Sequence, residues 1–398
     1  MAKPAASNRV HARLSVSFQR FFDSEKSSAL VLVACTALSL LLTNLSFGAD
    51  YLALWQIPVA GMGVGHWIND GLMAVFFLLI GLELERELYS GELSQLKNAL
   101  LPLVAALGGI VTPAMLHFAL NAGTPAQAGI GIPMATDIAF ALGTLALLGA
   151  RVPASLKVFV VAFAVIDDLC AIVVIAVFYT TGLSLAYLAG ALAVWLLLVA
   201  MNRLLRGMAL LPYLLGGALM WFLLLKSGIH ATLAGVMLAF AIPYSAKEED
   251  QESPSHRLEE FLHKPVAFII SPLFALANTA IPIGAHWMRE LASGNSLGIM
   301  VGLLLGKPLG VTLICFLAVA VGLCRLPPDL GWRHIAGAGL LGGIGFTMSI
   351  FISNLAFAGA APLIDASKIA VLLASTLAGV LGFFWLGATP LSAGKVLS

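Results

Sequence analysis

Long apolar runs separated by short polar breaks form the dominant pattern of this chain. A helix that crosses a membrane needs about 20 mostly apolar residues, and windows of that kind recur along the whole sequence. The pattern therefore predicts an all-α polytopic membrane protein with about twelve transmembrane helices. Their approximate ranges are 28–47, 67–88, 99–120, 126–149, 155–179, 184–202, 209–226, 228–244, 264–286, 296–323, 334–357 and 365–388.

The predicted spans leave no room for a soluble domain. We expect one transmembrane domain over 28–390, a polar N-terminal segment at 1–27 and a short tail at 391–398. The first span is about 20 residues long and has no small-x-small cleavage site after it, so it is predicted to be an uncleaved helix and not a signal peptide.

Composition agrees with the membrane prediction. The 398 residues are 60% hydrophobic and 10% charged, whereas an ordinary soluble domain has about 25% charged residues. The net charge of +1 argues against a nucleic-acid partner. The four cysteines lie in or beside predicted helices without the spacing of a metal site, so we expect free thiols.

Lys and Arg are concentrated in every second predicted loop, and this distribution predicts the orientation of the protein in the membrane. Cytoplasmic loops of membrane proteins are enriched in these residues. With the N-terminus inside, all but four of the 21 basic residues lie on the cytoplasmic side or in the cytoplasmic termini. The exceptions are Lys226, Arg289, Lys368 and Lys307, and the last of these lies within a span. Both termini are therefore predicted to be cytoplasmic, which supports an even number of helices.

Four charged residues lie near the middle of predicted spans: Asp137 in the fourth, Asp167 and Asp168 in the fifth, and Lys307 in the tenth. A charge at the bilayer centre costs about 2.5–3.5 kcal/mol on insertion scales, so such residues are functional candidates. Structural ion pairs are the alternative explanation, but three acids and one base do not balance. The cluster favours a reversible cation or proton site.

Other charged residues lie closer to the helix ends. Asp70 is near the outer end of the second span, and Glu83, Glu85, Arg86 and Glu87 gather at its inner end. We expect these side chains to reach water.

Two spans carry residues that interrupt a helix. In the fourth, glycines and Pro133 precede Thr136 and Asp137, and the eleventh has a glycine-rich centre that includes Gly343 and Gly345. Proline cannot donate a backbone hydrogen bond and glycine weakens a helix, so a non-helical turn is predicted in each. Close helix packing is the alternative role for glycine in a membrane, and it suits Gly302, Gly306 and Gly310.

The broken spans occupy matching places in the chain. Spans 3–5, at about 99–179, and spans 10–12, at about 296–388, run in opposite directions across the membrane and have their broken helix in the middle. This suggests an inverted repeat whose broken helices cross near the midplane. Asp137 would then neutralise the positive helix ends and Lys307 the negative ones.

Several segments resemble one known family. They are INDGLMAVFFLLIGLELERE (68–87), PMATDIAFALG (133–143), AVIDDLCAIVVIA (164–176), SGIHATLAGV (227–236), GLLLGKPLG (302–310) and GGIGFTMSIFI (342–352). In this order and spacing they resemble the NhaA-type sodium/proton antiporters of the bacterial inner membrane, themselves among the transporters described with inverted repeats.

The resemblance implies a secondary active transporter and not an enzyme. Such a protein exchanges cytoplasmic Na⁺ or Li⁺ for about two protons by alternating access, electrogenically and with regulation by pH. It implies a multi-pass inner-membrane protein in a lipid bilayer, with no cofactor apart from the transported ions. The family also forms homodimers through a small hairpin, for which the loop from Leu45 to Trp67 is suited; an ordinary loop is the alternative.

The resemblance also assigns roles to residues. Asp168 matches the main cation ligand, Asp167 the carboxylate that pairs with Lys307, and Thr136 with Asp137 the unwound fourth helix. Gly343 and Gly345 fall in the unwound eleventh helix. The cytoplasmic pH-response region would comprise Glu83, Arg86, Glu87, Glu259 and His263. His230 matches a further position that affects the pH response, although a packed interfacial histidine fits it as well, and residue 260 is Glu where the family pattern has histidine.

Helix geometry is compatible with separate roles for the adjacent aspartates. Neighbouring residues point about 100° apart around a helix, so Asp168 can line an ion cavity while Asp167 faces the tenth span. Asp167 is then only a secondary candidate for the metal. A hard cation prefers oxygen ligands, which the Asp168 carboxylate, the Thr136 hydroxyl, unwound carbonyl groups and water can supply.

Three other functions compete with ion exchange. An intramembrane aspartyl protease would pair Asp137 with Asp168 but has no need for Lys307. A light-driven pump would hold retinal on Lys307, which twelve spans with two broken helices do not suit. A sodium-coupled symporter of the same fold is the nearest alternative, although the sequence has no obvious polar pocket for an organic solute.

Overall fold

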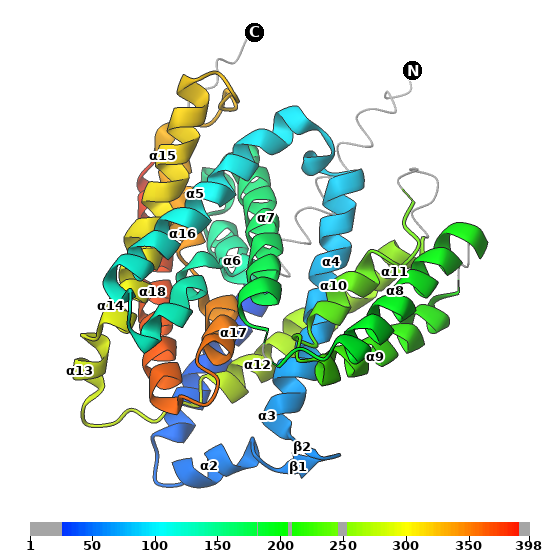
Figure 1. The fold of residues 1–398 in the computed structure, drawn as a ribbon. Coiled ribbons are helices and arrows are strands. Elements are labelled where there is room, and N and C mark those ends of the chain that lie inside the picture. The colour runs from blue at the N-terminus through cyan, green and yellow to red at the C-terminus, as the bar shows by residue number, and fades with distance from the viewer. Residues whose placement is uncertain (1–25, 181, 206–208, 246–252, 390–398) are drawn as a thin grey trace, which may run out of the picture.

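The computed structural model describes residues 26–180, 182–205, 209–245 and 253–389. Most of the predicted N-terminal segment 1–27 and all of the predicted tail 391–398 lie outside this range. The described chain is almost entirely helical (Figure 1). The first helix is Lys26–Thr43, and the other elements up to the middle of the chain are α2 Gly48–Leu54, β1 Pro58–Val59, β2 Met62–Gly63, α3 Val64–His66, η1 Trp67–Leu72, α4 Met73–Tyr89, η2 Glu92–Ser94, α5 Leu96–Asn121, η3 Pro125–Met134, α6 Ile138–Leu148, η4 Gly149–Arg151, α7 Ala154–Phe178 and α8 Leu185–Leu205.

The second half of the chain is also helical. Its elements are α9 Leu210–Ser227, α10 Leu233–Ala239, α11 Pro254–Pro265, η6 Val266–Ile270, α12 Ser271–Asn278, α13 Trp287–Leu291, α14 Gly294–Val301, η7 Gly302–Gly306, α15 Lys307–Ala320, α16 Trp332–Gly342, α17 Phe346–Ala356 and α18 Ala361–Ala388. Across both halves, η1, η6 and η7 are π-helical turns inside longer helices.

The chain is an all-α polytopic membrane protein. Among the described residues, ten helices are long and apolar enough to cross a membrane, and the bent pair α16 and α17 makes an eleventh. The predicted span 228–244 contains only α10, which has 7 residues. Such a helix rises about 10 Å, too little to cross the hydrocarbon, so a twelfth span stays a prediction.

Both spans expected to be interrupted are interrupted. The fourth consists of the 3₁₀ segment η3, an extended stretch at 135–137 and then α6. The eleventh bends by 46° between α16 and α17, across residues 343–345. Pro133 and the local glycines explain why these breaks occur where they do.

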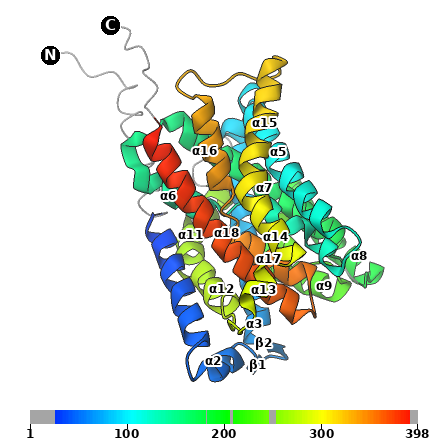
Figure 2. The ribbon, with the colours of Figure 1, turned by 90° about the vertical axis from the view of Figure 1, so that its left-hand side faces the viewer.

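Close helix packing depends on glycine where α5 meets α15. A Cβ atom added to Gly310 would overlap the carbonyl group of Gly108, and one added to Gly108 would overlap that of Gly310. The two helices lie side by side in both views (Figures 1 and 2). The packing role considered for Gly302, Gly306 and Gly310 is therefore present: a Cβ at Gly302 or Gly306 would press against Pro133 or Pro113.

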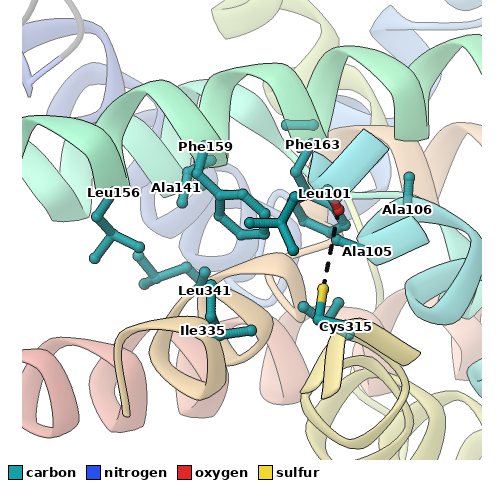
Figure 3. Close-up of a cluster of buried hydrophobic side chains, with 14 of the residues drawn as sticks. Leu101, Ala105, Ala106, Ala141, Leu156, Phe159, Phe163, Cys315, Ile335 and Leu341 are labelled. Atoms are coloured by element: carbon teal, nitrogen blue, oxygen red, sulfur yellow. Dashed lines mark hydrogen bonds between the residues drawn. The ribbon is translucent and has the colours of Figure 1, made fainter. Parts of the chain in front are cut away.

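A buried apolar cluster joins these helices to α7 and α16 (Figure 3). Leu101 from α5 and Phe159 and Phe163 from α7 pack in it, and the Cys315 thiol donates to the Leu101 carbonyl oxygen over 3.9 Å. Cys315 is fully buried and all four cysteines are free, as expected. The cluster fixes α7, which carries the paired aspartates, against α15, which carries Lys307.

The loop from Leu45 to Trp67 contains the expected hairpin. Val59 pairs with Met62 in an antiparallel register, and Ala60 and Gly61 turn the chain with φ of 49° and 85°. The Trp67 indole donates to the Val59 carbonyl oxygen at 2.8 Å. The hairpin lies at the end of the bundle opposite the C-terminal end of α18 (Figure 2).

Replacing Gly310 by valine should destabilise the protein by about 1–3 kcal/mol, the usual cost of overpacking, because the new side chain meets the Gly108 carbonyl group. The melting temperature of the purified protein in detergent measures this. Gly284→Ala is the control, since no atom lies within 4 Å of the added Cβ. Equal melting temperatures for the two variants would contradict the role of this contact.

Candidate functional site

The carboxylate of Asp137 lies at the start of two helices. Its backbone is extended, with φ −89° and ψ 104°, and Oδ1 accepts from the Phe140 backbone N–H at 3.2 Å, which caps α6. Oδ2 accepts from the Thr347 backbone N–H at 3.0 Å and from the Thr347 hydroxyl at 2.5 Å, in the first turn of α17. A negative group is favourable at each helix N-terminus, so one side chain serves both ends.

The two broken spans meet at their breaks. The Asp137 backbone N–H donates to the Ile344 carbonyl oxygen at 2.6 Å, and the Thr136 hydroxyl donates to the Gly342 carbonyl oxygen at 2.9 Å. Backbone groups released by one break are thus satisfied at the other, as apolar surroundings require.

Gly345 permits this contact, and Gly343 permits a close approach to the tenth span. A Cβ at Gly343 would overlap the Leu303 carbonyl oxygen, and one at Gly345 would lie 3.1 Å from the Ala135 carbonyl oxygen. The N–H groups of Gly345 and Phe346 both donate to the Ser375 hydroxyl of α18 at 3.2 Å.

Lys307 and Asp167 form a fully buried ion pair. The Nζ atom lies 2.7 Å from Asp167 Oδ2, and both side chains are 0% exposed. Nζ also donates to the Thr136 hydroxyl at 3.0 Å and lies 5.6 Å from the centre of the Phe163 ring. The pairing expected from the family resemblance is therefore present. Among the described residues, Lys307 contacts the C-terminal end of α16 through the Thr136 hydroxyl, whereas the helix-end charges predict a direct contact.

Asp168 is in a different environment from its neighbour. It is 2% exposed and lines a cavity of about 80 Å³. The Oδ1 atoms of Asp167 and Asp168 both lack a hydrogen-bond partner among the described residues, so the cavity is what distinguishes Asp168. A water molecule needs only about 10–15 Å³ of such volume, so the cavity has room for an ion with water. Asp167 does not line it, in agreement with the 100° rotation between adjacent helical residues.

The cavity brings together polar groups from six helical spans. Its polar lining residues are Ser28, Glu83, Thr136, Asp137, Asp168, His263, Ser271 and Thr347. Oxygen atoms predominate among them, which suits a hard cation. Glu83 and His263, expected in the pH-response region, lie on the same cavity as Asp168.

The rest of the expected pH-response region clusters between α4 and α11. Arg86 Nε lies 3.0 Å from Glu259 Oε1, and Arg86 Nη2 lies 3.6 Å from Glu87 Oε1. Glu260 is exposed on α11. His230 is separate: it packs edge-on against Phe351, with ring centroids 6.2 Å apart, and does not line the cavity.

Glu85 corrects one expectation. It was expected to reach water, but it is 4% exposed and accepts from the Ser255 hydroxyl of α11 at 3.2 Å. The expectation was wrong because α11 packs over this face of α4. The helical spacing indicates this burial, because Glu85 follows the buried Leu78 by seven residues and the buried Leu82 by three, which places all three on one helix face.

Sequence reasoning also missed Thr347 and Ser375, which hold the start of α17. Thr347 had a local signal, because it lies two residues after Gly345 in the turn where a helix begins. Ser375 had none, because it reaches the break from another helix.

Comparison with known proteins agrees with this geometry. A family model described as "Na+/H+ antiporter 1" matches residues 19–386. The chain belongs to this family. It is 66% identical over 374 residues to a Na(+)/H(+) antiporter NhaA of Dechloromonas aromatica (strain RCB), covering 94% of this chain and 96% of the relative.

Other members of the antiporter family are also similar over nearly their whole length. Na(+)/H(+) antiporter NhaA 1 of Flavobacterium johnsoniae is 55% identical over 374 residues, 94% of this chain and 97% of the relative. Na(+)/H(+) antiporter NhaA of Cytophaga hutchinsonii is 54% identical over 373 residues, 94% and 95%. These relatives are named for transport and not for a chemical conversion.

Ser375→Ala should destabilise the break before α17 by about 1–3 kcal/mol, because it leaves two buried N–H groups without an acceptor. Thermal unfolding in detergent measures the loss. The neighbouring Thr376→Ala is the matched control, since Thr376 is exposed and its hydroxyl bonds only within its own helix. If both variants melt alike, Ser375 does not hold the break.

Proposed function

We propose that this protein is an electrogenic secondary active antiporter that exports cytoplasmic Na⁺ or Li⁺ in exchange for about two protons. The observation that carries the proposal is the unpaired oxygen of Asp168 on a small polar cavity, directly beside the buried pair of Asp167 and Lys307. Family membership supports the exchanged ions.

Na⁺ binds first, to the deprotonated carboxylate of Asp168. The ion enters the cavity from the side of Glu83 and His263 and finds further oxygen ligands in its lining. A rocking motion then exposes Asp168 to the other side, where protonation releases the ion. Competition between H⁺ and Na⁺ for one carboxylate makes the exchange obligatory.

The second proton resides on the pair of Asp167 and Lys307, on whichever member is neutral. If two protons enter for each Na⁺ that leaves, one net charge moves inward per cycle. That charge is worth about 2.3 kcal/mol per 100 mV of membrane potential, which drives export without any cofactor.

Regulation by pH is assigned to the charged residues between α4 and α11. The ion pair of Arg86 with Glu259 lies near the end of the cavity that Glu83 and His263 line. Protonation there would change the charge around the ion entrance, and the exposed Glu260 belongs to the same surface. His230 would act only indirectly, through Phe351.

The same proposal includes the architecture in the membrane. It comprises twelve spans in one antiporter domain at 28–390, both termini in the cytoplasm, and inverted repeats at about 99–179 and 296–388. The protein would lie in the bacterial inner membrane, surrounded by lipid, as a homodimer joined through the hairpin of β1 and β2.

The competing functions fit the site less well. An organic substrate usually occupies about 300–1,000 Å³, far more than the cavity of about 80 Å³ at Asp168, which argues against a symporter. An aspartyl protease would share a proton between two aspartates, but the Asp137 oxygens accept from Phe140 and Thr347.

Asp168→Asn should abolish Na⁺-dependent proton movement while leaving a folded protein, because an amide cannot exchange a proton for Na⁺. Dequenching of a ΔpH dye in everted vesicles, repeated with Na⁺, Li⁺ and K⁺, measures this. The exposed Asp50→Asn on α2 is the control. Exchange with normal apparent affinity in Asp168→Asn would refute the assignment.

Lys307→Ala should change the charge moved per cycle or the pH dependence of exchange, because it removes one half of the second proton site. Current and pH change recorded together in proteoliposomes give the ratio. Lys226→Ala, an exposed lysine on α9, should leave both unchanged. Unchanged values in Lys307→Ala would remove this residue from the mechanism.

A further inference from the structure

A layer of aromatic side chains lies beside the Asp168 cavity. Phe77 of α4, Phe274 of α12 and Phe351 of α17 are each at most 1% exposed. The Phe351 ring lies 5.6 Å from Phe77 and 6.4 Å from Phe274, between ring centroids. The helices that carry this layer all continue beyond it, away from Glu83 and His263.

Three asparagines hydrogen-bond to one another beyond the aromatic layer. Asn278 Nδ2 donates to Asn69 Oδ1 at 2.7 Å, and Asn354 Nδ2 donates to Asn278 Oδ1 at 2.7 Å. Asn278 is 3% exposed, and its Nδ2 also donates to the Phe274 carbonyl oxygen at 3.0 Å. We name Asn69, Asn278 and Asn354 the asparagine clasp.

Helical spacing places the asparagine clasp over the ion cavity. In α12, Asn278 follows the cavity residue Ser271 by seven residues, and in α17, Asn354 follows the cavity residue Thr347 by seven. Seven residues make about two turns, so each pair shares a helix face at a separation of about 10 Å. The same faces of α12 and α17 thus carry the ion cavity and then the asparagine clasp.

The asparagine clasp joins elements that the proposed transport cycle must separate. α12 contacts both η1 and α17, and α17 begins at the Asp137 carboxylate. The amides satisfy one another, with Asn278 buried and Asn69 and Asn354 partly buried, whereas separated amides would need water as a partner. They are also uncharged, so they can close a path without trapping the cation as a carboxylate would.

We propose that the asparagine clasp is the closure of the ion path on the side opposite Glu83 and His263. Its amides are positioning residues that hold α17 against α12 and η1 while the cavity at Asp168 is reached from the Glu83 side. The inference rests on the proposed transport function and assigns to that cycle the contact that must break when the path opens on the other side.

Chemical labelling tests the closure directly. Met348 lines the cavity and is 1% exposed, so Met348→Cys reports whether the path is open. The four native cysteines are replaced by alanine, and a membrane-impermeant maleimide is added to right-side-out vesicles, from the face on which the asparagine clasp lies. Asn278→Ala and Asn354→Ala should each raise the labelling rate by about threefold or more, the order expected from losing a hydrogen bond.

Asn202→Ala is the matched control. Asn202 is part-buried and donates to the Ala241 carbonyl oxygen at 3.1 Å, away from the cavity lining, so the labelling rate should stay at the parent value. In everted vesicles, Asn278→Ala should also raise the apparent KM for Na⁺ on the cytoplasmic face, since fewer molecules are open to that face.

Labelling rates in Asn278→Ala and Asn354→Ala equal to that of Asn202→Ala would overturn the closure. Using two clasp variants guards against one that fails to fold. The labelling needs no transport: a parent protein without Na⁺-dependent exchange would refute the proposed function, whereas exchange with unchanged labelling would refute only the asparagine clasp.

Discussion

The structure depends on one buried carboxylate that stabilises two broken helices at once. Asp137 accepts hydrogen bonds from the first turns of α6 and α17. In an apolar surrounding, the unpaired N–H groups of a helix start are costly, and each break creates such a start. One carboxylate at both helix N-termini accepts from the N–H groups of both. The same arrangement brings Thr136 and Gly342 into contact. The cavity at Asp168 exists because continuous helix is missing here.

The pair of neighbouring aspartates shows how packing gives identical residues different chemistry. Asp167 faces Lys307 and forms an ion pair with no exposed surface. Asp168, one position along the same helix, faces the cavity. Each carboxylate has an Oδ1 atom without a hydrogen-bond partner among the described residues, but only that of Asp168 belongs to a residue lining the cavity. A buried ion pair is weak evidence for net stability. A carboxylate that lines a cavity is suited to exchange ligands.

The two sides of the cavity are built from different groups. Towards Glu83 and His263 they are charged or titratable, and α11 covers Glu85 as well. On the other side they are aromatic rings, with His230 packed against Phe351, and then neutral amides. Charged groups attract and respond to ions at an entrance, whereas rings and mutually bonded amides exclude water. This asymmetry fits the proposed path that opens to one side at a time.

Most of the outline of this protein could be predicted from its sequence. The apolar runs specify membrane helices, the position of Pro133 and the glycines specifies two breaks, and charges at the centre of spans mark Asp137, Asp167, Asp168 and Lys307 as functional candidates. These predictions rest on local properties: the length of an apolar run, the backbone limits of proline and glycine, and the cost of a charge in hydrocarbon.

Contacts between distant segments could be decided only by the tertiary structure. Ser375 supports α17 from another helix, Glu85 is buried because α11 covers it, and the seventh-residue spacing of Asn278 and Asn354 becomes meaningful only when α12 and α17 lie together. By itself the sequence determined which charged side chains would carry a free-energy cost in the membrane and where helices must break. Only the tertiary structure decided which of those groups are paired and which carboxylate lines a cavity, because pairing depends on distances between helices far apart in the chain.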